Sequence, residues 1–399
     1  MSVRRAPGVR KLEPASRIAP AHCDSTHAIL AGHADLDAHG SGPRGLPGFF
    51  LGPSGLPSGE PSEIAMATQR FYAAACQTAF DCPAQRHEIA ARTARMCAIA
   101  EATILGYEPF HDVRLLVFPE FAHAAPIYES VEMLRNRLAI PVPNEHTDRY
   151  AALAKKYGCY LQTGTFLEVD PDFPDVVFNT TALVGPSGIL SKYRKLNPWI
   201  PWELHASPHD VEGYDQDPFP VVETELGRLG AAICYDWLFP ETIRELAFKG
   251  AEVLLRVSAY MDPWGATPPL DWWTLFNRAR AVENTAYVVA ANQGAEMRCY
   301  PPFSWPGASM VVDYDGRILA QADPGPGEKV VVAPIDLEAL RAERARRVGH
   351  DMRSHLRTEV HTYLREPLFE RAGPAHPITI ANLKERIASA KKRLEERRP

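Results

Sequence analysis

The chain has 399 residues, of which 46% are hydrophobic and 23% are charged, a balance typical of a globular protein with ample apolar material for a core. Its formal net charge of -6 argues against a general nucleic-acid binder, because such a protein usually carries a basic face. No apolar run approaches the roughly 18 residues of a membrane-spanning helix, and no apolar stretch of a secretory signal follows Arg4 and Arg5. We therefore expect neither nucleic acid nor a membrane as a partner.

Seven cysteines are scattered along the chain, and none of them forms a C-x-x-C pair. An odd count in a chain of this length predicts reduced thiols in a cytoplasmic protein, and argues against a disulfide framework or a zinc cage. We also expect no metal at His123, His205 and His209, because their spacing matches no metal-binding motif. The remaining role of interest for a cysteine is that of a nucleophile.

Residues 1–65 form an extension that we do not expect to fold. Within residues 41–63, glycine and proline occupy 11 of 23 positions. Such a segment buries too little apolar surface to offset the entropy lost on ordering. The sequence therefore predicts an extension, a domain over residues 66–349 and a tail over residues 350–399.

From residue 70 onward, short apolar runs alternate with segments of helical periodicity. In chain order, the pattern predicts a strand at 71–80, a helix at 85–105, a strand at 114–118, a helix at 145–157, strands at 160–166, 177–184, 189–193 and 229–234, a helix at 241–249, a strand at 252–257, a helix at 270–283, strands at 286–291, 308–313, 318–322 and 329–334, and a helix at 337–347. The alternation indicates an α/β fold. Because several strands also form hairpins, we expect mixed sheets.

The tail carries an amphipathic helix. Ile380, Leu383, Ile387 and Leu394 fall at helical spacing, with lysine and arginine on the opposite face. A helix of this kind needs an apolar surface to cover its apolar face. That surface belongs either to its own domain or to a neighbouring subunit. Because the tail has no obvious place on the domain, we predict that it crosses to a neighbouring copy of the chain.

Three chemically useful side chains follow predicted strands, at the edge of a sheet where open α/β folds bind ligands. They are Glu120, Lys195 and Cys234. Each alone has an ordinary explanation, since a cysteine at a strand end is often a small buried hydrophobe. Together they complement one another: a thiol attacks, a carboxylate moves its proton, and an ammonium stabilises an oxyanion.

The segments Phe118-Pro119-Glu120, Tyr193-Arg194-Lys195 and Ile233-Cys234-Tyr235-Asp236 resemble, in this order, the motifs of the nitrilase superfamily of carbon–nitrogen hydrolases. The resemblance spans roughly residues 71–335. It implies a four-layer α-β-β-α sandwich, a Glu-Lys-Cys triad and assembly into a homodimer or higher oligomer. It implies neither a metal nor an organic cofactor.

Two features are similar to the aliphatic amidase and formamidase branch of that superfamily. Tyr235-Asp236 follows the cysteine, where nitrilases usually carry Trp-Glu, and Glu203 lies eight residues after Lys195 in a loop rich in proline and tryptophan. The resemblance implies that Glu203 is a second glutamate of the site. Trp237-Leu238 departs from the Gly-Asn usual in those amidases, which leaves the size of the acyl pocket open.

The sequence therefore predicts hydrolysis of a small carboxamide to a carboxylic acid and ammonia through a cysteine thioester. Cys234 is the expected nucleophile, Glu120 the proton shuttle and Lys195 an oxyanion donor. Candidate substrate-binding residues are Tyr128, Trp202, Tyr235 and Trp237. Two alternatives remain: a nitrilase or N-carbamoyl-compound hydrolase with the same triad, and a non-catalytic oligomeric scaffold.

Overall fold

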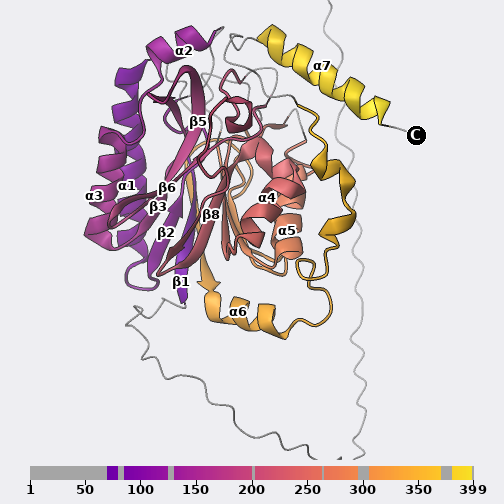
Figure 1. Cartoon of the computed structure of the whole chain (residues 1–399). Helices are drawn as coiled ribbons and strands as arrows, with labels where there is room; N and C mark the ends of the chain where they lie inside the picture. Colours follow the sequence, from indigo (N-terminus) through magenta and orange to yellow (C-terminus); the bar gives the residue numbers. More distant parts are fainter. Residues whose placement is uncertain are drawn as a thin grey trace, which may run out of the picture. The chain divides into compact units, whose positions relative to one another are not determined.

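Two β-sheets stack face to face between layers of helices (Figure 1). The computed structural model describes residues 70–79, 85–124, 130–199, 203–262, 265–294, 305–369 and 380–397. All of them belong to one unit, which spans Pro61–Pro399. The predicted extension at residues 1–65 lies outside the described residues.

The first sheet is mixed, as its hairpins predicted. Its order is β13-β1-β2-β3-β5-β4, with β6 beside β5. Strand β1 runs parallel to β2 and antiparallel to β13, so the two neighbours of one strand have opposite directions. The strands are β1 (Arg70–Gln77), β2 (Val113–Val117), β3 (Tyr160–Gln162), β4 (Phe166–Asp170), β5 (Phe173–Gly185), β6 (Gly188–Arg194) and β13 (Lys329–Asp336).

The second sheet has the order β12-β11-β10-β9-β8-β7. Its central strands β8, β9 and β10 are parallel and buried on both faces, which explains why they read as apolar runs without alternation. Its strands are β7 (Val221–Thr224), β8 (Gly227–Ile233), β9 (Val253–Ser258), β10 (Tyr287–Asn292), β11 (Met310–Val312) and β12 (Ile318–Gln321).

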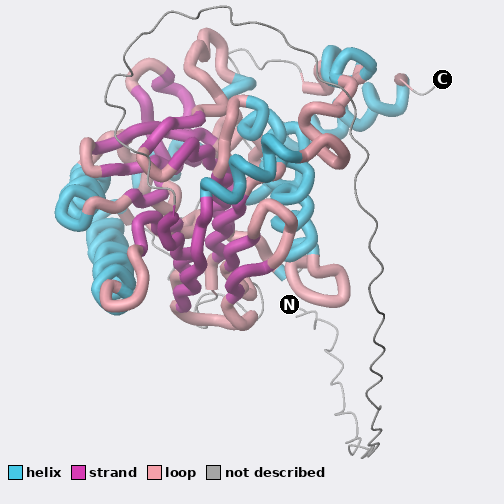
Figure 2. Tube along the Cα trace, turned by 90° about the horizontal axis from the view of Figure 1, so that it is seen from below, coloured by secondary structure: helices cyan, strands magenta, loops and turns pink. Residues whose placement is uncertain are grey.

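Helices cover the outer face of each sheet, which completes four layers (Figures 1 and 2). Helices α1 and α3 pack on the first sheet, and α4 and α5 pack on the second. The α-β-β-α sandwich implied by the resemblance is therefore confirmed. The helices are α1 (Ile89–Tyr107), α2 (Val131–Arg137), α3 (Glu145–Tyr157), α4 (Pro240–Phe248), α5 (Trp272–Asn284), α6 (Leu337–Arg346) and α7 (Ile380–Glu396).

Two neighbouring residues of β2 pack in different parts of the hydrophobic core. Leu115 packs between the two sheets, whereas Leu116 packs between the first sheet and its helices. Successive side chains of a strand point to opposite faces, so β2 is apolar on both sides and its carboxyl end is held from two directions. Residues just beyond that end are thereby fixed in place.

The predicted strand at 160–166 is instead two strands, β3 and β4, separated at Gly164. A Cβ atom at Gly164 would lie 2.5 Å from Ala122 Cβ and 2.6 Å from the Pro119 oxygen, so the chain can pass the loop after β2 only with glycine there. Helix α2 and strand β7 were not predicted, because each is short and only partly buried. Gly164 thus brings a second chain segment against the loop that carries Glu120.

Helix α7 contacts its own chain. The Arg386 guanidinium makes two hydrogen bonds to the Asp210 carboxylate, at 2.7 and 2.6 Å, and Leu383 and Ala390 are buried. The tail helix therefore contacts its own domain, which is one of the two surfaces considered from the sequence. Among the described helices, none combines the length and apolarity needed to cross a bilayer.

Candidate active site

Glu120, Lys195 and Cys234 all lie just beyond the carboxyl ends of strands. Glu120 follows β2, Lys195 follows β6 directly, and Cys234 follows β8 and opens the 3-10 turn Cys234–Leu238. The first two belong to one sheet and Cys234 to the other, so the site forms where the two sheets meet. The structure brings these three residues together with Glu203.

Lys195 lies between two carboxylates. Its Nζ atom donates to Glu120 Oε1 at 2.8 Å and to Glu203 Oε1 and Oε2 at 2.6 and 2.7 Å. The ammonium group is fully buried. Burial alone would lower the pKa of Lys195, but Glu120 and Glu203 raise it above its ordinary value. Lys195 is therefore a permanent cation at the centre of the site.

Glu120 is held by donors on both of its oxygens. Oε1 accepts from Lys195 and from Asn179 Nδ2 at 2.9 Å, and Oε2 accepts from the Ala259 N–H at 3.1 Å. Gln293 Nε2 donates to the backbone oxygen of Glu120 at 2.8 Å. Burial raises the pKa of Glu120 above its ordinary value, although Lys195 opposes the rise. A carboxylate of raised pKa is suited to taking up and returning a proton.

Cys234 has a strained backbone. Its φ angle is +45°, in the left-handed region that non-glycine residues rarely adopt and that costs about 1–3 kcal/mol. A strained strand-to-helix turn of this kind exposes the nucleophile of many hydrolases. Cys234 lies close enough to Glu120 for the carboxylate charge to raise the pKa of the thiol. The turn therefore brings the sulfur near the proposed proton acceptor.

The Cys234 thiol is protonated at neutral pH. Burial, together with the negative charge of Glu120, raises its pKa to about 12, and Lys195 lowers it only in part. Because a thiol must lose its proton to become a strong nucleophile, this sulfur needs a base at the moment of attack. Glu120 is in position to be that base.

Glu203 is ionised and tightly held. Burial would raise its pKa, but Lys195 and His205 lower the pKa to about 2. Its Oε2 accepts from the Trp199 N–H at 2.5 Å and lies 3.0 Å from His205 Nε2. His205, which the sequence excluded as a metal ligand, thus serves as a partner of Glu203. Glu203 is better suited to orienting Lys195 than to exchanging protons, because it keeps its charge near neutral pH.

Asn179 is a contact of the site that the sequence did not reveal. It lies within an apolar strand as part of Asn179-Thr180-Thr181, which resembles a glycosylation sequon. In the structure it is fully buried and donates to Glu120. The available signal was a polar side chain in an otherwise apolar buried strand, which requires a partner.

The predicted substrate-binding residues have different positions. Tyr235 is half-buried beside Cys234, with its ring packed edge-on against Phe239. Trp237 is fully buried, and its Nε1 donates to the Ala232 oxygen at 3.1 Å. Its role in binding the acyl group stays a prediction. Tyr128 and Trp202 lie outside the described residues.

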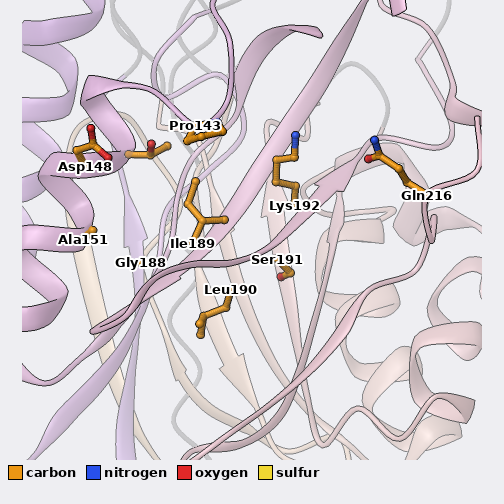
Figure 3. Close-up of a pocket in the computed structure, with 10 residues that line it drawn as sticks. Pro143, Asp148, Ala151, Gly188, Ile189, Leu190, Ser191, Lys192 and Gln216 are labelled. Carbon is orange, nitrogen blue, oxygen red and sulfur yellow. The ribbon is translucent and has the colours of Figure 1, made fainter. Parts of the chain in front are cut away.

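A separate pocket of about 450 Å³ lies along β6 and α3 (Figure 3). Its lining includes Asp148 of α3, Leu190 and Lys192 of β6, and Gln216. Lys192 Nζ is already bound to Glu168 at 2.7 Å. None of the four clustered site residues lines this pocket. Among the described residues, no group of three or more His, Cys, Asp or Glu side chains is arranged to hold a metal ion.

Residues 68–345 match the family model described as carbon-nitrogen hydrolase. The chain belongs to the carbon–nitrogen hydrolase family. The sequence-based prediction of a family that acts on carbon–nitrogen bonds is therefore confirmed. The matched region contains all four clustered site residues of this carbon–nitrogen hydrolase.

Curated relatives of this carbon–nitrogen hydrolase include formamidases of Bacillus cereus. The formamidase of strain B4264 is 32% identical over 227 residues, which are 56% of this chain and 62% of the relative. That of strain Q1 is 30% identical over 269 residues, 66% of this chain and 74% of the relative. The chain thus spans about three fifths of the first relative's length. The predicted similarity to formamidases is confirmed.

Solved structures show the same fold. Saccharomyces cerevisiae Nit3, a member of branch 10 of the nitrilase superfamily, matches with a TM-score of 0.57 at 26% identity over 71% of this chain and 96% of that chain. A carbon–nitrogen hydrolase from Helicobacter pylori G27 matches with a TM-score of 0.58 at 21% identity over 75% of this chain and 99% of that chain. The nitrilase-like fold of this family member is confirmed.

Proposed function

We propose that this protein hydrolyses a small carboxamide to a carboxylic acid and ammonia through a thioester on Cys234. The observation that carries the proposal is the position of Lys195, which is bound to Glu120 on one side and to Glu203 on the other, next to the Cys234 thiol. The cluster unites a nucleophile, a base of raised pKa and a fixed cation in a buried site.

The first half-reaction forms the thioester. Cys234 Sγ attacks the amide carbon while Glu120 takes the thiol proton, which solves the problem of a thiol pKa near 12. Lys195 and the Tyr235 N–H stabilise the resulting oxyanion. When the intermediate collapses, the carbon–nitrogen bond breaks, and Glu120 returns the proton to the departing ammonia.

The second half-reaction releases the acid. Water attacks the thioester carbon while Glu120 takes one of its protons, the carbon–sulfur bond breaks, and the proton returns to the Cys234 sulfur. Glu203 holds Lys195 in place throughout, because its charge and its two hydrogen bonds fix the ammonium. Both half-reactions therefore use the same four groups.

An amide substrate is supported by Tyr235-Asp236 after the nucleophile, by the Lys195-to-Glu203 spacing, and by the formamidase relatives. A nitrile or an N-carbamoyl compound is the alternative for the same triad. Incubation of the full chain with matched panels of short amides, nitriles and N-carbamoyl compounds, followed by ammonia measurement, separates these. Release from nitriles alone overturns the amide proposal.

A catalytically idle scaffold is the other alternative, and thiol labelling separates it from an enzyme. Cys76 is also fully buried and has a pKa raised to about 12, but none of the acid–base pairs described above contacts it. An active site predicts that a small electrophile labels Cys234 far faster than Cys76. Equal labelling favours the scaffold. A reducing, cytoplasmic setting belongs to this proposal, because seven cysteines scattered without a C-x-x-C pair are typical of reduced thiols.

We also propose at least a homodimer. Leu270, Trp272 and Leu275 expose 56%, 37% and 55% of their surface around α5. Large apolar side chains gathered on one surface usually mark an interface. The helix is part of the outer layer that covers the second sheet, so a second copy can pack on it without blocking the strand ends that carry the site.

A further inference from the structure

Arg256 is a buried arginine close behind the nucleophile. It lies in β9, and its side chain is fully buried. Its guanidinium carbon is 5.4 Å from the ring centre of Trp237, 5.5 Å from that of Tyr260 and 4.3 Å from that of Trp273. Three aromatic rings therefore surround the cation and contribute favourable cation–π contacts.

No carboxylate of the described residues forms an ion pair with Arg256. Its Nη1 donates to Asn277 Oδ1 at 2.8 Å, while its Nε and Nη2 have no partner in the described part of the chain. A buried charge without an opposite charge normally costs several kcal/mol. Burial lowers the pKa of Arg256 to about 10, so the group is still a cation at neutral pH. Such a costly arrangement calls for a compensating anion.

The strand register places Arg256 beside the nucleophile turn. Arg256 pairs with Ala232 of β8, two residues before Cys234, and the Ala232 oxygen also binds Trp237. Of the charges that favour the Arg256 cation, that of Cys234 is the largest. The Cys234 thiolate is thus the anion that would stabilise the Arg256 cation most, and this thiolate exists only during the reaction.

We propose that Arg256 is a positioning residue that stabilises negative charge on the Cys234 sulfur from the core side. The inference rests on the proposed function. At rest, Glu120, Glu203 and Lys195 together carry one net negative charge. When Glu120 takes the thiol proton, this total is unchanged, and the negative charge moves from the carboxylate to the sulfur. Arg256 favours that transfer from the core side of the sulfur, because charges interact strongly in a buried site.

The groups that act on the Cys234 thiol come from several elements. Glu120 and Glu203 disfavour the thiolate, whereas Lys195 favours it. Tyr260 is neutral near pH 7, because burial raises its pKa to about 12. Arg280 of α5 acts on Arg256, but its own charge is paired with Glu283 at 2.9 Å. Arg280 also donates to the oxygens of the nucleophile turn. The charge of Arg280 is therefore already neutralised by Glu283, and its guanidinium helps to hold the turn.

The test is Asn277→Asp, which changes almost no volume but gives Arg256 a carboxylate partner. If Arg256 acts through its charge, the new carboxylate neutralises that charge. Alkylation of Cys234 by iodoacetamide then slows about tenfold at neutral pH, which corresponds to a rise of about one unit in the thiol pKa. The rate is measured against pH in the full chain, with half-buried Cys97 as internal reference. If Arg256 only fills space, the new carboxylate leaves the alkylation rate unchanged, which overturns the inference.

Three further variants complete the experiment. Arg256→Met is expected to slow alkylation at least as much as Asn277→Asp, whereas Arg256→Lys restores part of the rate. Asn277→Leu removes the hydrogen bond without adding charge, so it is expected to stay within about twofold of the parent rate. An unchanged rate in Arg256→Met, or slowing by Asn277→Leu equal to that by Arg256→Met, overturns the inference. Failure of the proposed function is recognised separately, as turnover that survives Cys234→Ala.

Discussion

Tyr193 and Asp236 join the two strands that carry the lysine and the cysteine. Tyr193 Oη donates to Asp236 Oδ2 at 2.7 Å, which links β6 to the 3-10 turn after β8. The other oxygen of Asp236 accepts from the Asn197 N–H at 2.8 Å. One buried carboxylate thus holds the position of Lys195 relative to Cys234 across the two sheets.

We expect Tyr193→Phe to lower both stability and turnover. A hydrogen bond to a charged group contributes about 1.5–3 kcal/mol to the free energy of unfolding, and its loss frees the two halves of the site to shift. Denaturant unfolding and kcat/KM are the measurements. Tyr150→Phe is the matched control, because the buried Tyr150 hydroxyl bonds His123 at 2.9 Å within the helix-facing core. An equal loss of kcat/KM in both variants would contradict the linking role.

The charge of Glu203 predicts a specific acid sensitivity. Its folded-state pKa of about 2 lies below the ordinary 4.5, so its ionised form stabilises the fold above pH 4.5 and this contribution is lost as the pH falls towards 2. A shift of this size corresponds to about 3 kcal/mol. We expect Glu203→Gln to lose that part of the slope of unfolding free energy against pH. The measurement is urea unfolding at a series of pH values between 5 and 2, and an unchanged slope would refute the assignment.

Sequence reasoning reached the parts of the site that depend on strand ends. Glu120, Lys195 and Cys234 could be singled out because each follows an apolar run, and the ends of such runs meet at one edge. The interior partners could not be found in this way. Whether Trp237 faces the substrate or the core, and whether Asn179 meets Glu120, depends on which sheet packs against which. Arg256 reads as one polar residue in a buried strand until its aromatic neighbours are known.

Removal of a triad group should nearly abolish turnover. We expect Cys234→Ser, Glu120→Gln and Lys195→Met each to lower kcat by at least about a thousandfold, because groups that act as a unit fail together. Cys76→Ser is the matched control, since Cys76 is equally buried but belongs to the other core. Ammonia release under saturating amide is the measurement. Turnover within tenfold of wild type in Cys234→Ser would exclude the thioester route.

Helix α7 should stabilise the loop that follows Glu203. Asp210 ends the 3-10 turn Pro208–Asp210, and its fork-to-fork pair with Arg386 is only partly exposed. We expect Asp210→Ala and Arg386→Ala each to cost about 1 kcal/mol and the double variant to cost no more than either, as in a coupled pair. Thermal unfolding of the four proteins measures this. Additive losses would show that the two residues act independently in solution.

The exposed face of α5 allows the proposed dimer to be tested with a single substitution. Leu275 lies on the helix surface with 55% of its area exposed, and a charge introduced there would be buried in any dimer that uses this face. Because an unpaired buried charge costs several kcal/mol, Leu275→Glu should convert the dimer to a monomer without unfolding the protein. Phe110→Glu is the control: Phe110 is 77% exposed, just after α1 in the opposite helical layer, and its change should leave the assembly intact. Sedimentation velocity of the full chain and both variants gives the answer. A monomeric wild type would contradict the dimer. Dissociation by Phe110→Glu alone would show that the interface lies on the opposite helical layer.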